Sequence, residues 1–375
     1  MPSRFDSHAV FAGLLGTEEH GFWRLAPARV EGTEPSTPTV TLSRRLIDPG
    51  IGVGHPRGTV RVTDFMPPRD GAPQLIRIVE GISGRVSMRS ELRMRFSYGR
   101  VTPWVHKVDG RTVAVAGPDS VWLDTQADTY GQNLTTYSDF TVAPGDRIAF
   151  TISWQPSHRE PPALPEPESS LEATESFWRE WVDQCTYHGP YREAVVRSLI
   201  TLKALTYAPT GGIVAAPTTS LPEEIGGVRN WDYRYTWLRD AAITLLPAAH
   251  RLSRGGPRLA RVAAAAVAGD PENLQIMYGI AGERELGEAE LDWLPGYENS
   301  SPVRVGNGAA NQLQLDVYGE VTEALHLAHM TGLTRNDYAM GLQLKLISYL
   351  EKHWDEPDEG IWEVRGPRRH FVHSR

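Results

Sequence analysis

The sequence predicts a β-sheet domain followed by an all-α domain. Three observations carry this prediction: alternating apolar and polar residues within the first 155 residues, a proline-rich segment after them, and helical spacing from residue 172 onward. The length of 375 residues corresponds to about two and a half domains at roughly 150 residues each. We therefore divide the chain into a β-sandwich domain at 1–155, a linker with a linker helix at 156–186, and a helical domain at 187–375.

Residues 86–96 show the alternation most clearly. Apolar or small residues occupy every even position from Val86 to Phe96, and mostly polar residues stand between them, as in a strand with one buried and one solvated face. Shorter segments of this kind are 58–65, 75–79, 112–116, 120–123 and 147–154. Many short strands separated by polar turns predict an antiparallel sandwich, in which we see no catalytic constellation.

Five prolines lie between residues 156 and 168, so this segment is predicted to be extended and semi-rigid. Apolar residues then recur at helical spacing. The expected helices are 172–182, 191–207, 237–251, 257–280 with a break, 311–330 and 335–354, with no strands among them. The loops near 208–235, 280–310 and 355–375 are long for a compact helical domain, which indicates a functional role.

Composition and charge exclude several classes of protein. No apolar run approaches the roughly 20 residues that a membrane helix needs, so no membrane partner is expected. The net charge of −8 argues against a nucleic-acid partner. One cysteine, Cys185, excludes a disulfide framework within the chain. The N-terminus lacks an apolar segment of signal-peptide length, which predicts a cytoplasmic location if Met1 is the natural start.

Residues 229–240 form the most unusual cluster in the sequence. They include four aromatic rings, three arginines and two aspartates, a mixture that fits neither a helix face nor a strand face. Such a mixture suits a sugar pocket, because rings pack on the apolar faces of a pyranose while charged groups bind its hydroxyls. The alternative is a structural Arg/Asp network that caps the helix starting near Trp237.

Residues 355–366 form a second cluster, in which an acidic run precedes Trp362, Glu363 and Val364. We interpret 355–359 as a solvated loop. It is no EF-hand calcium loop, because the twelfth position is Gly366 rather than Glu. The apolar neighbours of Glu363 are expected to raise its pKa and keep it protonated, as a general acid requires. Catalytic and structural roles for Glu363 both stay open at this point.

A third segment, 294–316, contains Gly-x-Gly at 306–308. It lacks the third glycine and the preceding strand of a nucleotide fingerprint, and the sequence contains no Walker, Gly-x-Ser-x-Gly or His-Glu-x-x-His motif. His370 and His373 are interpreted as solvated. No cofactor and no metal are therefore indicated.

The three clusters together resemble glycoside hydrolase family 15, the bacterial glucoamylase and trehalase group. Residues 230–241 are similar to its tyrosine-rich Trp-x-Arg-Asp segment, 360–366 to its acid loop and 302–320 to the segment between them. Residues 4–7 and 14–16 resemble the start of its sandwich domain. The resemblance implies an N-terminal β-supersandwich, a linker helix and an (α/α)6 barrel. It also implies inverting, exo-acting hydrolysis that releases glucose from a small-molecule α-glucoside, a maltooligosaccharide or trehalose.

The resemblance also implies roles for individual residues. Glu363 matches the general acid that protonates the leaving oxygen. The residues implied to bind substrate are Tyr233, Trp237, Arg239, Asp240, Trp362 and Arg365. Fungal glucoamylases carry a second Glu directly after the acid, where this chain has Val364; any sugar contact made there is lost, or is expected to move to Arg365.

Measured against this family, the chain resembles a fragment that holds about five barrel helices. Inversion needs a second carboxylate roughly 6.5–9.5 Å from the acid, which the family carries beyond the acid loop. We therefore expect the 375-residue chain alone to be inactive or nearly so. The alternatives are an inactive fragment, a carbohydrate-binding or interaction module without turnover, and a phosphate-dependent enzyme. The glycosidic linkage (α-1,4, α-1,6 or α,α-1,1) and the oligomeric state stay open.

Overall fold

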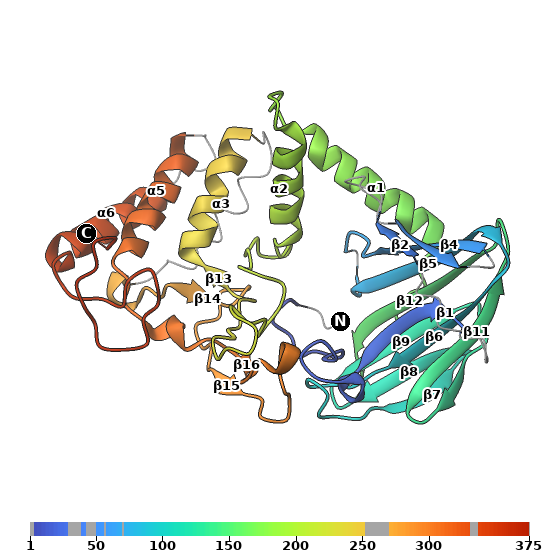
Figure 1. Ribbon diagram of the computed structural model, residues 1–375. Helices are drawn as coiled ribbons and strands as arrows, with labels where there is room; N and C mark the ends of the chain where they lie inside the picture. Colours follow the sequence, from blue (N-terminus) through green and yellow to red (C-terminus); the bar gives the residue numbers. More distant parts are fainter. Residues whose placement is uncertain are drawn as a thin grey trace. The chain divides into compact units, whose positions relative to one another are not determined.

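The computed structural model describes residues 4–28, 39–42, 50–55, 58–69, 71–251, 270–330 and 337–374. The chain forms two compact units, Met1–Glu180 and Trp181–Arg375. Antiparallel sheets build the first unit, and the helices α2, α3, α5 and α6 belong to the second (Figure 1). The predicted succession of an antiparallel β-sheet domain and a helical region is therefore confirmed.

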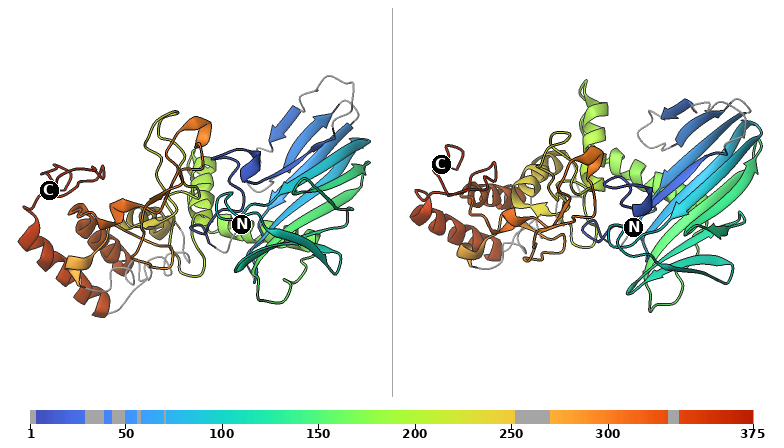
Figure 2. Two further views of the ribbon diagram at one scale, coloured as in Figure 1. Left: turned by 90° about the horizontal axis from the view of Figure 1, so that it is seen from below. Right: turned by 60° about the horizontal axis from the view of Figure 1, so that its bottom comes forward.

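The first unit contains two antiparallel sheets, seen as two layers of strands in Figure 2. The four-stranded sheet has the order β1 (Phe22–Pro27), β6 (Val86–Arg93), β11 (Thr135–Val142), β10 (Tyr130–Gln132). The eight-stranded sheet has the order β2 (Thr39–Leu42), β3 (Gly50–His55), β4 (Gly58–Phe65), β5 (Gln74–Gly84), β12 (Arg147–Pro156), β9 (Asp119–Thr125), β8 (Arg111–Ala116), β7 (Trp104–Val108).

Both sheets contribute side chains to one hydrophobic core. Met88 and Leu92 from β6 join Phe150 and Ile152 from β12 in a single buried cluster. Burial alternates along β6, as its period-two pattern predicts. Trp23 of β1 contacts Phe150 edge-on across the layers, with ring centroids 6.5 Å apart. The inner faces of the two sheets are thus joined by apolar packing.

The strands that sequence reasoning missed include all four sheet edges, which are β1, β10, β2 and β7, together with β3 and β11. An edge strand need not bury a continuous face, so its sequence carries little alternation. The burial of β7 and β10 illustrates this, because β10 is exposed throughout and no residue of β7 is fully buried.

Five α-helices lie in the part of the chain that the structure describes. They are α1 (Pro167–Asp183), α2 (Arg192–Ala204), α3 (Leu238–Arg251), α5 (Asp316–Met330) and α6 (Asp337–His353). In the second unit α3 packs against α5, and α5 against α6. Ala242 of α3 and Ala324 of α5 are buried together, and their small side chains let the two helices approach closely. No helix within the described ranges is long and apolar enough to cross a membrane.

The prediction of a helical half without strands is wrong in detail. Four two-residue strands occur there: β13 (Thr236–Trp237) pairs with β14 (Met277–Tyr278), and β15 (Ala289–Glu290) with β16 (Arg304–Val305). Strands this short show no period in the sequence. Of the helix expected at 257–280, residues 257–269 lie outside the described residues, and the rest contains a 3-10 turn, Pro271–Asn273, followed by β14.

The helix expected at 311–330 begins five residues later than predicted. Gly308–Asn311 form a 3-10 turn, and α5 starts at Asp316. The backbone N–H groups of Leu313 and Leu315 donate to carboxylates of a distant loop instead of entering a helix. A contact with residues far along the chain therefore delays the start of this helix.

Truncation of Phe150 tests the shared core of the two sheets. Phe150→Ala removes a fully buried ring and is expected to destabilise the first unit by about 3–5 kcal/mol. Chemical denaturation followed by circular dichroism measures the change. Val105→Ala on the exposed edge strand β7 is the control and should have little effect; equal losses for both variants would contradict the assignment of the core.

Candidate functional site

A cavity of about 970 Å³ lies in the second unit. It is lined by Ala215, Glu223, Arg229, Trp231, Tyr233, Trp237, Arg239, Asp240, Asn307, Ile361, Trp362, Glu363, Val364 and Arg365. All seven site residues named from the sequence are among them, although they come from segments more than 120 residues apart. The structure thus gathers every predicted site residue around one cavity.

Backbone hydrogen bonds hold residues 231–237 as extended chain along one side of the cavity. The N–H of Ala215 donates to the carbonyl of Tyr235 at 3.0 Å, and that of Ala216 to the carbonyl of Tyr233 at 2.9 Å. The strand β13 ends at Trp237, and α3 begins at the next residue. This strand-to-helix junction explains why Trp237, Arg239 and Asp240 reach the same cavity.

Part of the aromatic cluster is structural. Asp232 is 0% exposed and receives a two-pronged ion pair from Arg234, at 2.8 and 2.7 Å. The same carboxylate accepts the N–H of Gly306 at 3.1 Å. The Asp232 carbonyl accepts a hydrogen bond from the Asn307 side chain at 3.2 Å. These two residues thus form a structural Arg/Asp pair, but among the described residues it binds the segment at Gly306 and Asn307 and no cap of α3 is shown, while their neighbours line the cavity.

Two residues at the junction of β13 and α3 approach Glu363. The indole Nε1–H of Trp237 donates to Glu363 Oε1 at 2.6 Å, and Arg239 Nη2 lies 3.5 Å from the same oxygen. The Glu363 side chain is 22% exposed. Burial raises the pKa of Glu363 above its ordinary value, and the Trp237 hydrogen bond and the Arg239 charge offset only part of that rise. This environment favours the protonated carboxyl.

The loop around Glu363 adopts uncommon backbone angles. Glu363 has φ +51°, a left-handed conformation that costs a non-glycine residue about 1–3 kcal/mol and is concentrated at functional sites. Gly360 has φ +67°, and a Cβ there would lie 2.6 Å from the ring of Phe371. Glycine is therefore required at 360 by both its φ angle and its close contact with Phe371.

The interpretation of 355–359 as a solvated loop is wrong for its last two residues. Asp358 is buried, and its carboxylate accepts the backbone N–H of Leu315 at 3.0 Å. Glu359 accepts the N–H of Leu313 at 2.8 Å. These bonds attach the loop to the segment before α5. A run of charges along the sequence gives no sign of such partners.

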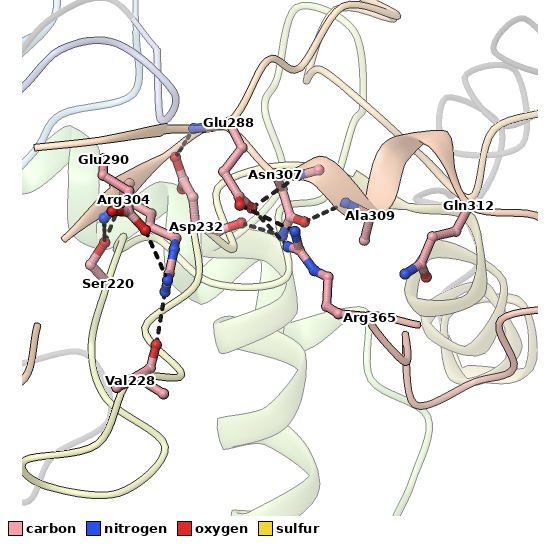
Figure 3. A network of polar contacts seen from close by, with 12 residues as sticks. Ser220, Val228, Asp232, Glu288, Glu290, Arg304, Asn307, Ala309, Gln312 and Arg365 are labelled. Atoms are coloured by element: carbon pink, nitrogen blue, oxygen red, sulfur yellow. Dashed lines mark hydrogen bonds and ion pairs between the residues drawn. The ribbon is translucent and has the colours of Figure 1, made fainter. Parts of the chain in front are cut away.

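Arg365 is committed to neighbouring side chains. Its guanidinium forms two hydrogen bonds with Glu288, at 3.1 and 2.7 Å, and lies 4.5 Å from the ring centroid of Trp231. Arg304 lies over the same ring at 4.6 Å. Figure 3 shows the two arginines within one polar network that joins three loops. Sequence reasoning missed Glu288, because nothing in the sequence indicates its pairing with a residue 77 positions later.

The remaining aromatic residues differ in their accessibility. The Trp362 ring is 84% exposed beside the acid. Tyr233 is half-buried, and its ring centroid lies 5.8 Å from that of Trp237. Its hydroxyl donates a hydrogen bond to Glu223 Oε1 at 3.4 Å. Burial, reinforced by the nearby carboxylates, raises the pKa of Tyr233 to about 12. Glu223 also pairs with Arg229 at 2.9 Å and was not identified from the sequence.

Further carboxylates surround Arg239. Its Nη1 donates to Gln314 Oε1 at 3.1 Å and lies 3.8 Å from Asp316. Burial raises the pKa of Asp240 and of Asp316. Burial and the charge of Asp316 together raise the pKa of Glu320 to about 7. Asp240 of α3, which lines the cavity, and Asp316 and Glu320 of α5 thus lie near one guanidinium, that of Arg239.

Two family profiles match this chain. Residues 189–375 match Glycosyl hydrolases family 15, and residues 2–126 match the N-terminal domain described as trehalase-like. The chain belongs to glycosyl hydrolases family 15. The match to the family 15 profile includes every residue of the cavity, and the N-terminal match covers most of the sheet domain.

Curated relatives of this family 15 chain include two trehalases. The trehalase of Thermoplasma acidophilum is 31% identical over 379 residues, covering 99% of this chain and 64% of that protein. The trehalase of Mycolicibacterium smegmatis is 36% identical over 315 residues, covering 80% of this chain and 47% of that protein. The chain thus spans about half to two thirds of the length of the curated relatives it matches.

A solved structure shares the fold of this family 15 chain. A putative kojibiose phosphorylase from human microbiome aligns with a TM-score of 0.52 at 9% identity, covering 88% of this chain and 48% of that one. At this identity the likeness concerns the fold alone, a sheet domain followed by a helical region.

Replacement of Asp232 tests the buried network beneath the cavity. Asp232→Asn removes the charge that compensates Arg234 and is expected to destabilise the second unit by about 3–5 kcal/mol. Denaturant titration followed by helical circular dichroism measures the loss. Asp292→Asn, an exposed change in the same unit, is the control and should be nearly neutral; the same result for Asp232→Asn would contradict the structural role.

Proposed function

We propose that this chain forms the acid-bearing part of a site that hydrolyses α-glucosides, with trehalose as the substrate. The observation that carries the proposal is the setting of Glu363, a largely buried carboxyl with a raised pKa in a cavity lined by aromatic and charged side chains. Membership of family 15 and the curated trehalases support the reaction class and the substrate.

In the proposed reaction Glu363 acts as general acid. It donates its proton to the glycosidic oxygen as the bond from that oxygen to the anomeric carbon breaks, and one glucose leaves with this proton. A water attacks the anomeric carbon from the opposite face and gives its own proton to a second carboxylate, which yields the inverted product. Trp237 and Arg239 orient Glu363 through the oxygen that they both approach.

The substrate contacts follow from the cavity lining. Tyr233 and the exposed ring of Trp362 offer apolar faces for a glucosyl ring. Asp240 and Arg239 stand at the start of α3 and would bind the hydroxyls of the non-reducing glucose. Arg365 lines the cavity while it is paired with Glu288. We propose that it contacts the sugar and helps to position it in the cavity.

At the level of architecture, we propose that α2, α3, α5 and α6 belong to an (α/α)6 barrel whose cavity is the one described. The packing of α3 against α5 and of α5 against α6 is compatible with neighbouring barrel helices. The second carboxylate would then come from barrel residues that this chain does not contain. On that view the 375-residue chain binds sugar but turns it over slowly.

Titration calorimetry on the 375-residue chain tests sugar binding. Trehalose should bind more tightly than maltose, and Asp240→Asn should weaken binding by about 10–100-fold, because a charged hydrogen bond contributes roughly 1.5–3 kcal/mol. Glu356→Gln, an exposed change beside the acid loop, is the control. Absence of trehalose binding, or tighter binding of maltose, would refute trehalose as the substrate. Substantial glucose release by this chain alone would refute the need for a further carboxylate.

Glu363→Gln tests the general acid. In a protein that also supplies the second carboxylate, this substitution should lower kcat for trehalose by about 10²–10⁴-fold while trehalose affinity is retained. Hydrolysis of α-glucosyl fluoride should be spared, because fluoride leaves without a proton from the enzyme. Glucose release from both substrates is the measurement. An equal loss on both would show that Glu363 supports the site in some other way than by donating a proton.

Trp237→Phe tests how the pKa of the acid is set. The indole N–H stabilises the ionised carboxylate, so its removal should raise the pKa of Glu363 further. Activity requires protonated Glu363 and is lost as pH rises through its pKa, so the alkaline limb of kcat/KM should move to higher pH. Tyr233→Phe, whose hydroxyl faces Glu223, is the control for loss of a cavity group. A shift of the limb to lower pH would contradict this account.

A further inference from the structure

Three potential metal ligands meet beside the cavity. Asp316 is the first residue of α5, Glu320 lies one turn further along the same helix, and His373 comes from the C-terminal segment. One possible ligand atom from each of the three residues lies within 4.8 Å of the other two. The i, i+4 spacing of the two acids places them on one face of α5.

The buried carboxylate of Asp316 lacks hydrogen bonds. Its side chain is 5% exposed, and neither of its oxygens has a hydrogen-bond partner among the described residues. Buried carboxylates in proteins are normally hydrogen-bonded, paired or bound to metal, because an isolated buried charge is costly. Glu320 Oε2 is buried in the same way and also has no such partner.

Neither Arg239 nor His373 supplies a hydrogen bond to the Asp316 carboxylate. Arg239 Nη1 is 3.8 Å from Asp316 Oδ2 and donates its hydrogen bond to Gln314 instead. His373 Nε2 is also 3.8 Å from Asp316 Oδ2, which is too far for a hydrogen bond. Two carboxylates thus lie close together with positive charge near them but without directional partners.

We propose that Asp316, Glu320 and His373 form a binding site for a divalent first-row transition metal, Zn²⁺ or Mn²⁺. Carboxylate oxygens and an imidazole nitrogen suit these ions, whereas Mg²⁺ and Ca²⁺ prefer oxygen ligands alone. Ligand atoms about 2.0–2.2 Å from one ion lie at most about 4.4 Å apart, so binding needs a small contraction of the cluster. The His373 side chain is 51% exposed, which leaves it room to rotate inward.

An ion at this position would tie the segment that follows the acid loop to α5. His373 stands ten residues after Glu363, and Asp316 is the first residue of α5. Just before α5, the backbone N–H groups of Leu313 and Leu315 donate hydrogen bonds to Glu359 and Asp358. The proposed ion therefore has a structural role next to the cavity. It does not depend on the proposed hydrolysis.

Metal titration of the 375-residue chain tests the site. After treatment with a chelator, calorimetry with Zn²⁺ and Mn²⁺ should give one site per chain, with weaker binding of Mg²⁺ and Ca²⁺. Asp316→Asn should weaken Zn²⁺ and Mn²⁺ binding by at least about tenfold. His373→Ala should do the same and remove the preference over Mg²⁺. Bound Mn²⁺ gives a second readout, since nitrogen coupling in its electron paramagnetic resonance spectrum should disappear in His373→Ala.

Matched variants separate this site from adventitious binding. Glu351→Gln on an exposed position of α6 and His370→Ala on the C-terminal segment should leave metal affinity unchanged. Asp316→Asn removes a buried charge, so the metal-free variant should be at least as resistant to denaturant as the unchanged chain. Absence of a stoichiometric site would overturn the proposal, and so would metal affinity that survives both Asp316→Asn and His373→Ala or is lost equally in His370→Ala.

Discussion

The walls of the cavity depend on one fully buried carboxylate, that of Asp232. This carboxylate pairs with Arg234 and accepts a hydrogen bond from the backbone N–H of Gly306. The backbone carbonyl of Asp232 accepts a further hydrogen bond from the Asn307 side chain. A buried charge is tolerated when its lone pairs are used in this way. The consequence is that the segments 231–237 and 304–309, which both contribute to the cavity lining, are joined by buried hydrogen bonds.

Opposing effects on one carboxyl decide the chemistry that the cavity can support. Burial disfavours the ionised form of Glu363, whereas Trp237 and Arg239 favour it. Burial prevails, so the pKa is raised while the same donors hold the side chain in one orientation. The general-acid role that we propose for Glu363 relies on both effects, because it needs a bound proton and a defined direction for its transfer.

The acidic groups near Arg239 are also shielded from solvent, but they differ from Glu363 in their hydrogen-bond donors. Asp316 and Glu320 place buried carboxylate oxygens near a guanidinium that already donates a hydrogen bond to Gln314. The pKa of each is raised, which shows that burial outweighs the neighbouring positive charge. The two sets of carboxylates differ in their donors: Glu363 receives a short hydrogen bond, and Asp316 receives none from the described residues.

The sequence alone was sufficient to predict the structural elements that depend on consecutive residues. The alternation in 86–96 predicted β6, the helical spacing predicted α1, α2, α3 and α6, and the density of rings and charges in 229–240 located the cavity. Strand and helix periods are properties of consecutive residues, so a sequence displays them directly. The resemblance carried by the same motifs led to family 15.

Features created by distant contacts were absent from the sequence pattern. The bond between Trp237 and Glu363 joins residues 126 positions apart, and Arg365, which lines the cavity, pairs with Glu288 at a distance of 77 positions. Asp358 was read as solvated and is buried. Such contacts have no period and are selected by which loops the folded chain brings together, so the chemical setting of each side chain was decided by the tertiary structure.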